Sequence, residues 1–152
     1  MEIQIYKLGL EHLDEVMEIE RLSVPQPWTR GMFEREICLP ISRFFVAQYG
    51  NRVVGYAGYW YVSDEAHIVN LAVHPDFRNK GVGRMMLEHM ERKMKNQGIG
   101  KALLEVRASN TAAQRLYECS GFRANGMRKN YYADEDAVLM EKEMGLNQNE
   151  NR

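Results

Sequence analysis

The sequence predicts a three-layer α/β fold around a mixed sheet of about seven strands, with a parallel pair of strands at its centre. Two observations lead to this prediction. Segments with strand and helix patterns follow one another in the order β-α-α-β-β-β-α-β-α-β-β. A helix follows each of the apolar strands at residues 67–73 and 102–107, and a strand–helix–strand connection joins parallel strands.

The first three elements are a strand and two helices. Apolar and polar residues alternate over residues 3–8, which is typical of a strand. Apolar residues then recur at helical spacing over residues 10–23, and Pro25-Gln26-Pro27 ends this helix in an extended loop. Thr29 has the chemistry of an N-cap, so we expect a second short helix to run from there to about Leu39.

Three strands follow. Residues 43–49 and 53–62 lie on either side of Gly50-Asn51, and they predict a β-hairpin. The next strand covers residues 67–73 and ends at His74-Pro75.

The remaining elements begin with a helix from Gly81 to Gly98. Its inward stripe at helical spacing comprises Val82, Met85, Met86, Met90 and Met94, which we interpret as flexible core filling. A strand at residues 102–106 precedes a helix at residues 110–120, in which Cys119 is expected to be buried. Residues 122–132 and 137–144 predict a final hairpin.

Composition restricts the class of protein. The chain has 152 residues, of which 45% are hydrophobic and 27% charged, as in a globular domain; we expect one domain over residues 1–146 and a polar tail over 147–152. The N-terminus lacks the pattern of a signal peptide, and no apolar stretch is long enough to span a bilayer. The two cysteines fit no metal-site spacing. The sequence therefore predicts a cytoplasmic protein with no metal and no membrane partner.

Charge is distributed unevenly along the chain. The formal net charge is −1, which does not favour nucleic acid as a partner. From Arg78 to Lys101, however, the sequence has seven basic residues and only two acidic ones, which gives this segment a formal charge of +5. Such a block indicates a small anionic ligand, although a solvated helix face is an alternative.

The turn before the long helix is a candidate anion site. It comprises Arg78, Asn79, Lys80, Gly81, Val82, Gly83 and Arg84. The first turn of a helix offers unpaired N–H groups and a partial positive charge, and glycines allow a phosphate to approach the backbone. The run is not a P-loop, and the third glycine of a dinucleotide fingerprint is replaced by Met86. Simple loop flexibility remains an alternative for the two glycines.

Two further residues stand out before any family is considered. Glu105 interrupts an apolar strand, where a carboxylate must be paired or solvated; an ion pair with Arg107 or an edge position would explain it. Tyr117 lies on the inward face of its predicted helix, where ordinary core packing would explain it.

These motifs resemble a known family when taken together. Residues 70–75 followed by Arg78-x-x-Gly81-x-Gly83 resemble the acetyl-CoA signature of the GCN5-related N-acetyltransferase (GNAT) family. Further motifs resemble one branch, the RimI-type ribosomal-protein-alanine N-acetyltransferases and their relatives that acetylate protein N-termini. They are Leu104-Glu105-Val106-Arg107-Ala108-Ser109-Asn110, Leu116-Tyr117, Gly121-Phe122, Arg128-Lys129-x-Tyr131-Tyr132, Glu135-Asp136-Ala137 and Pro27-Trp28. The resemblance covers residues 3–144.

The resemblance implies how acetyl-CoA would be bound. The central parallel strands would diverge and hold the pantetheine arm against the backbone of Leu71, Ala72 and Val73. The pyrophosphate would rest on the N–H groups of residues 79–84, and Asn110, otherwise a helix cap, would bond the pantetheine arm. The +5 block would then serve the phosphates of one compact ligand.

The resemblance also implies a reaction. Acetyl would pass directly to the N-terminal amine of a protein, the expected acceptor being N-terminal alanine of a small-subunit ribosomal protein. Glu105 would be the general base, so we expect a glutamine there to flatten the pH–rate profile near neutrality. Tyr117 would protonate the departing thiolate, and the acceptor would be gripped by Pro27, Trp28, Tyr131 and Tyr132, although either tyrosine could merely pack on a helix.

Other functions remain open. The same fold could acetylate a lysine or a small amine, or serve as a non-catalytic acyl-CoA-binding module. The presence of both Glu105 and Tyr117 argues against the last. We expect a monomer or a weak dimer.

Overall fold

The computed structural model describes residues 1–145, so the predicted polar tail lies outside the described residues. The chain forms two compact units. The first comprises Met1–Trp60 and Asn70–Met90; the second comprises Tyr61–Val69 and the chain from Glu91 onward. The expectation of a single domain stays a prediction. Within residues 1–145 there is no helix with the length and apolar character needed to cross a bilayer.

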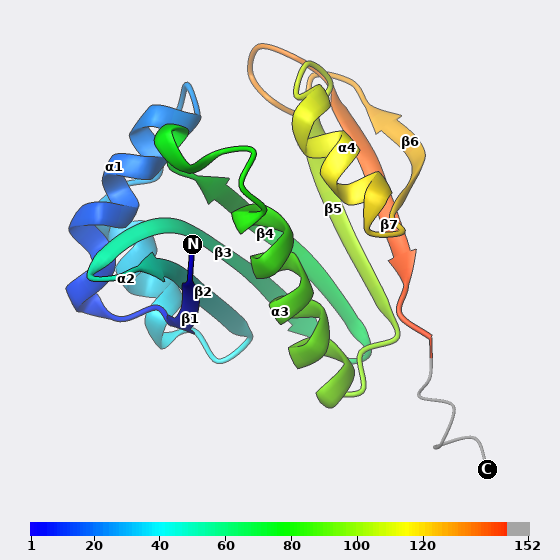
Figure 1. Cartoon of the computed structure of the whole chain (residues 1–152). Helices are drawn as coiled ribbons and strands as arrows, with labels where there is room; N and C mark the ends of the chain where they lie inside the picture. The colour runs from blue at the N-terminus through cyan, green and yellow to red at the C-terminus, as the bar shows by residue number, and fades with distance from the viewer. Residues whose placement is uncertain (146–152) are drawn as a thin grey trace. The chain divides into compact units, whose positions relative to one another are not determined.

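The described chain contains seven strands and four helices in the predicted order (Figure 1). The strands are β1 (Ile3–Lys7), β2 (Ser42–Tyr49), β3 (Arg52–Val62), β4 (Glu65–Val73), β5 (Lys101–Arg107), β6 (Arg123–Arg128) and β7 (Ala137–Glu143). The helices are α1 (Leu13–Ser23), α2 (Arg30–Cys38), α3 (Val82–Asn96) and α4 (Thr111–Cys119), with short 3₁₀ turns η1 (Leu10–His12) and η2 (Pro75–Phe77). The strand order β1-β2-β3-β4-β5-β7-β6 confirms the predicted mixed sheet.

Helices cover both faces of the strands in the first unit. Strands β1, β2 and β3 pair antiparallel. Neighbouring residues of a strand point to opposite faces. Tyr56 of β3 contacts Phe33 of α2, whereas a Cβ on the adjacent Gly55 would lie 2.8 Å from Met86 of α3. Helices α2 and α3 therefore pack on opposite faces, as a three-layer fold requires.

The second unit is built on β5, β7 and β6 with the first part of β4. Strand β5 pairs antiparallel with β7 and parallel with β4, which confirms the predicted parallel pair. The parallel register joins Glu65–His67 to Lys101–Leu103 and, within the described residues, stops before Ile68 and Leu104. The parallel register of the central pair is thus three residues long within the described chain.

Alternation along β5 separates a core face from a functional face. Ala102, Leu104 and Val106 are buried, whereas Leu103, Glu105 and Arg107 are only partly covered. The buried face lies on the side of the helices, because Lys142 of β7, the register partner of Ala102, donates to Glu91 of α3 and to the carbonyl of Ser120 after α4.

Three details of the sequence prediction were wrong. Strand β6 ends at Arg128 rather than Tyr132, because Asn130 takes a positive φ of 55° and its N–H donates to the Asp136 carboxylate, which begins a turn. Met85 is 36% exposed, because it lies at the edge of the α3 stripe. Cys119 is exposed, because Tyr117 takes the inward position in the last turn of α4.

Candidate active site

The predicted anion turn has the backbone geometry of a phosphate site. Asn79 and Gly81 adopt the left-handed conformation, with φ of 63° and 83°, and a Cβ at Gly81 would meet no atom within 4 Å. The first helical bond of α3 runs from the N–H of Met85 to the carbonyl of Gly81. The N–H groups of residues 81–84 therefore precede the helical ladder and, in an α-helix, have no acceptor within it. This turn fits an anionic group at the N-terminus of α3.

The basic side chains of this turn have different contacts. Arg78 donates through Nε to the carbonyl of Val73, at 3.0 Å, and through Nη2 to Ser23 Oγ, at 3.3 Å. It therefore ties the turn to the end of β4. Arg84 forms an exposed ion pair with Glu88 one turn along the helix, and Lys80 is exposed.

The end of β4 carries Leu71, Ala72 and Val73, the three residues predicted to meet the pantetheine arm. All three are partly exposed. Gly55 of β3 lies so close that an added Cβ would stand 3.1 Å from the carbonyl oxygen of Ala72. The buried Nδ2 of the preceding Asn70 has no hydrogen-bond partner among the described residues. An unsatisfied buried donor beside this segment fits a bound polar chain such as pantetheine.

The loop with Pro27 and Trp28 is anchored by a buried carboxylate. Glu20 of α1 is 2% exposed, and its Oε2 accepts the backbone N–H of Trp28 at 2.9 Å. Its Oε1 accepts the hydroxyl of Tyr56, whose pKa burial raises well above its ordinary value. The Trp28 ring packs 5.1 Å from that of Phe33, so Trp28 fastens the loop, whereas Pro27 is exposed.

Glu105 lies at the centre of the candidate catalytic group in the second unit. Its Oε1 lies 2.7 Å from Nε2 of His67, the last residue of β4 in the parallel register, and accepts the hydroxyl of Tyr131 at 3.1 Å. The hydrogen bond from His67 lowers the pKa of Glu105 by more than burial raises it, so this pKa lies below its ordinary value. Glu105 is therefore a carboxylate at neutral pH. The alternative of an ion pair with Arg107 is not found among the described contacts of Glu105, and Arg107 pairs with Asp134 and Glu135 in the loop after β6.

Helix α4 positions the other predicted residues of this unit. Asn110 caps the helix, accepting the N–H of Ala113 at 3.0 Å through Oδ1, so its structural role is confirmed and its ligand role stays a prediction. Tyr117 is buried, with its ring 5.6 Å from that of Phe122. Burial raises the pKa of Tyr117, and the neighbouring Tyr132 raises it further, so the Tyr117 hydroxyl stays protonated and able to donate.

Tyr131 and Tyr132 lie together in the β6–β7 loop. Their rings are 5.0 Å apart in an edge-to-face arrangement. Tyr131 is 41% exposed and reaches Glu105, whereas the ring of Tyr132 stacks beneath the Arg107 guanidinium at 4.3 Å. Burial, and to a lesser extent the neighbouring Tyr131, raises the pKa of Tyr132 to about 12. Tyr131 is thus the tyrosine of the pair that directly contacts the candidate base.

Sequence reasoning missed His67 and the partners of Arg107. His67 and Glu105 are 38 positions apart, and only the β4–β5 register brings them together. The alternation that places Leu103 and Glu105 on one face was visible, but the register was not.

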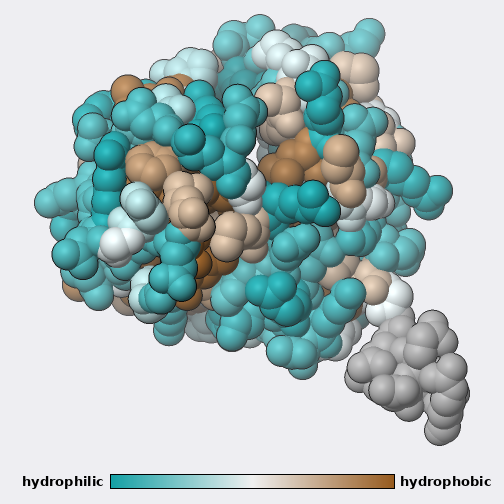
Figure 2. Space-filling view, in the orientation of Figure 1, coloured by the Kyte–Doolittle hydropathy of each residue, from teal (hydrophilic) through white to brown (hydrophobic). Residues whose placement is uncertain are grey.

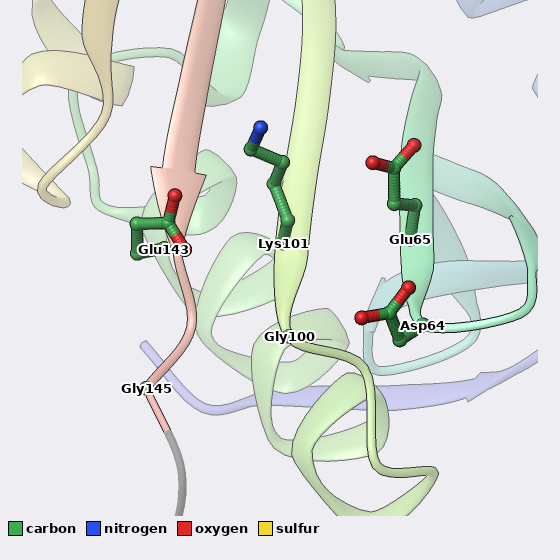
Figure 3. Close-up of a pocket in the computed structure, with 6 residues that line it drawn as sticks. All are labelled: Asp64, Glu65, Gly100, Lys101, Glu143 and Gly145. Carbon is green, nitrogen blue, oxygen red and sulfur yellow. The ribbon is translucent and has the colours of Figure 1, made fainter.

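A surface pocket lies elsewhere in the second unit. Figure 3 shows Glu65, Lys101 and Glu143, cross-strand neighbours on β4, β5 and β7, beside Asp64, Gly100 and Gly145. It lies four residues from Glu105 along β5, roughly 13 Å. Lys101 lies between two acidic register neighbours and forms its ion pair with Glu141 at 3.4 Å. Among residues 1–145, His, Cys, Asp and Glu side chains form no group of three suited to a metal ion.

Exposed apolar side chains contribute to the surface of the first unit. In Figure 2, hydrophobic residues gather on this unit near the N-terminus and are surrounded by hydrophilic ones. Met1, Tyr6 and Leu10 are the exposed apolar residues at this end of the chain.

Comparison with known proteins identifies the class. The sequence matches the acetyltransferase (GNAT) family over residues 13–122, and the chain belongs to this family. It is an N-acetyltransferase, and enzymes of this family use acetyl-CoA. The ribosomal protein bS18-alanine N-acetyltransferase of Salmonella typhimurium is 37% identical over 142 residues, covering 88% of this chain and 92% of that protein.

Solved structures agree with this assignment. The ribosomal-protein-S18-alanine N-acetyltransferase from Escherichia coli superposes with a TM-score of 0.87, is 33% identical and covers 96% of each chain. The PaiA N-acetyltransferase from Thermoplasma acidophilum, solved in complex with coenzyme A, has a TM-score of 0.81 at 21% identity, over 94% of this chain and 99% of that one, and it shares the fold. These structures confirm the predicted fold class.

Proposed function

We propose that this enzyme transfers acetyl from acetyl-CoA to the N-terminal α-amino group of a protein, with N-terminal alanine of a small-subunit ribosomal protein as the acceptor. The observation that carries the proposal is the ionised Glu105, held by His67 and by Tyr131 from the β6–β7 loop, in a chain with relatives named for that acceptor. The acceptor and the acetyl donor are both cytoplasmic, so we assign the reaction to the cytoplasm.

Acetyl-CoA is bound by backbone in this proposal. Its pyrophosphate rests on the N–H groups of the turn at residues 79–84, and its pantetheine arm meets the backbone of Leu71–Val73. The left-handed conformation at Asn79 and Gly81 and the unsatisfied donor on Asn70 support this placement.

The reaction forms an amide bond and breaks a thioester. A protonated amine cannot attack a carbonyl, so Glu105 accepts a proton from it, directly or through water. The nitrogen then attacks the thioester carbon, the carbon–sulfur bond breaks, and the thiolate takes the proton of the Tyr117 hydroxyl. The nitrogen of the new amide loses its second proton, which restores the Tyr117 hydroxyl through water, and Glu105 releases the first proton to solvent. No acyl-enzyme forms.

The weak basicity of an α-amine favours it as the acceptor. Its pKa is about 7.7–8.0, against about 10.4 for lysine, so roughly 10% is free amine at pH 7, compared with about 0.04% of lysine. This gap of roughly 2.5 units corresponds to about 3.5 kcal/mol. A carboxylate whose pKa is lowered is a weak base, and it therefore suits the α-amine better than a lysine side chain.

The test is a panel of peptides with acetyl-CoA, read by mass spectrometry. Each peptide is made in two forms, one with a free α-amine and no lysine, the other with a blocked N-terminus and one internal lysine. We expect acetyl only on the free α-amine, fastest when the first residue is alanine. Acetyl on the internal lysine with untouched α-amines would overturn the proposal.

A further inference from the structure

The loop that carries Tyr131 and Tyr132 is held by one arginine. Arg107 is 17% exposed, and its Nη1 lies 2.6 Å from Asp134 Oδ1 and 3.2 Å from Glu135 Oε1. Its guanidinium also stacks on the Tyr132 ring. One side chain of β5 thus makes three contacts with the β6–β7 loop, and it lies two residues from Glu105 on the same face of the strand.

Glu135 extends this connection to helix α4. Its Oε2 accepts the N–H of Ser109 at 3.0 Å, and its Oε1 accepts the Ser109 hydroxyl at 2.9 Å. Ser109 immediately precedes Asn110, the cap of the helix that carries Tyr117. Glu135 therefore joins the loop, Arg107 and the start of α4.

We propose that Arg107 and Glu135 form a latch that positions the Tyr131–Tyr132 loop against Glu105 and so governs binding of the acceptor. Neither latch residue contacts the reacting atoms; both are positioning residues. This inference rests on the proposed function, because it assigns the loop to the acceptor rather than to acetyl-CoA.

The latch acts at the contact between Tyr131 and Glu105. Tyr131 is partly exposed, and it packs edge-to-face on Tyr132 of the loop and beneath the guanidinium of Arg128 at the end of β6. Fixing Tyr132 under Arg107 therefore fixes the ring on which Tyr131 rests. Without the latch, the Tyr131 hydroxyl loses its defined distance from Glu105, and the acceptor loses one wall of its site.

The test compares Arg107→Gln and Glu135→Ala with a matched control, Arg123→Gln, which changes an exposed arginine of β6. We expect the KM for an alanine-terminated peptide to rise about 10- to 100-fold in both latch variants, as loss of hydrogen bonds between charged groups predicts, with the KM for acetyl-CoA within twofold. Arg107→Lys keeps the charge but not the paired geometry or the stacking, and we expect an intermediate value.

Hydrogen exchange tests the latch without relying on activity. Amides of residues 130–135 should exchange at least about tenfold faster in the latch variants, in the absence of any substrate, and at the wild-type rate in the control. Unchanged exchange of this loop, or an equal rise in both KM values, would overturn the latch. If the wild-type enzyme leaves peptide α-amines untouched, the proposed function fails, and the exchange rates still report on the latch.

Discussion

Replacement of Glu105 by glutamine tests the proposed base most directly. Glutamine keeps the size of the side chain and can still bond His67 and Tyr131, which the carboxylate meets at 2.7 and 3.1 Å, but it can no longer take up a proton. Loss of a general base lowers a rate by about 10²- to 10⁴-fold, or roughly 2.7–5.4 kcal/mol of transition-state stabilisation. We therefore expect kcat to fall within that range while the Kd for acetyl-CoA, measured by calorimetry, stays within twofold.

The matched control is Glu141→Gln. The Glu141 side chain is 16% exposed, against 18% for Glu105, and it forms an ion pair with Lys101 at 3.4 Å. Losing a carboxylate of equal burial from the same unit should leave kcat nearly unchanged. A fall in kcat of less than threefold for Glu105→Gln, or an equal fall in the control, would refute the assignment of Glu105 as the base.

The pH dependence follows from the lowered pKa of Glu105. Its carboxyl is ionised across pH 6–9 and protonates only as the pH falls through a value below the ordinary 4.5. The rise of kcat/KM through neutrality should therefore follow the acceptor amine, near pH 7.7–8.0, in wild type and variant alike. The flattening near neutrality expected from the sequence requires a carboxyl that titrates there; the lowered pKa of Glu105 argues against it, and the pH–rate profile of the variant decides between the two.

Three further changes test other parts of the molecule. Tyr117→Phe should lower kcat by about 10²-fold and leave the Kd for acetyl-CoA unchanged, and an unaltered kcat in steady-state assays would reject the proton-donor role. Gly83→Leu, at the second position of α3, should weaken acetyl-CoA binding about 10- to 100-fold by calorimetry, because the new side chain obstructs the free N–H groups of the turn. Gly31→Leu, at the second position of α2, is the control. Full affinity for acetyl-CoA in the Gly83 variant would exclude the phosphate turn. Tyr56→Phe should lower the free energy of unfolding by about 1–3 kcal/mol in urea, because the buried Glu20 loses a donor, and an unchanged midpoint would contradict this.

The order of elements could be predicted from local patterns alone. Thr29 caps α2 and Asn110 caps α4 as their residue types indicate. The errors fell where tertiary structure decides. Strand β6 was predicted too long because the turn that ends it depends on Asp136, six residues beyond Asn130.

The sequence singled out Glu105 as a candidate base but gave no indication of the residues that contact it. Glu105 was identified as an anomalous carboxylate, but its neighbour along the strand, Arg107, was the obvious partner by proximity in sequence. The actual partners, His67 and Tyr131, are 38 and 26 positions away. Strand register and loop conformation set such distances, and neither has a local signal in one sequence.

The division of the chain into two units has a consequence for dissecting the protein. The chain passes between the units three times, after Trp60 in β3, after Val69 in β4 and after Met90 in α3. Each passage falls inside a regular element rather than in a linker, and each unit is assembled from separate stretches of sequence. No single continuous fragment of the chain therefore contains one whole unit and nothing else. A split-protein reporter divided at any of these three points would interrupt a strand or a helix. The exposed Gly50-Asn51 turn of the first hairpin offers a better split point, because it leaves every strand and helix whole.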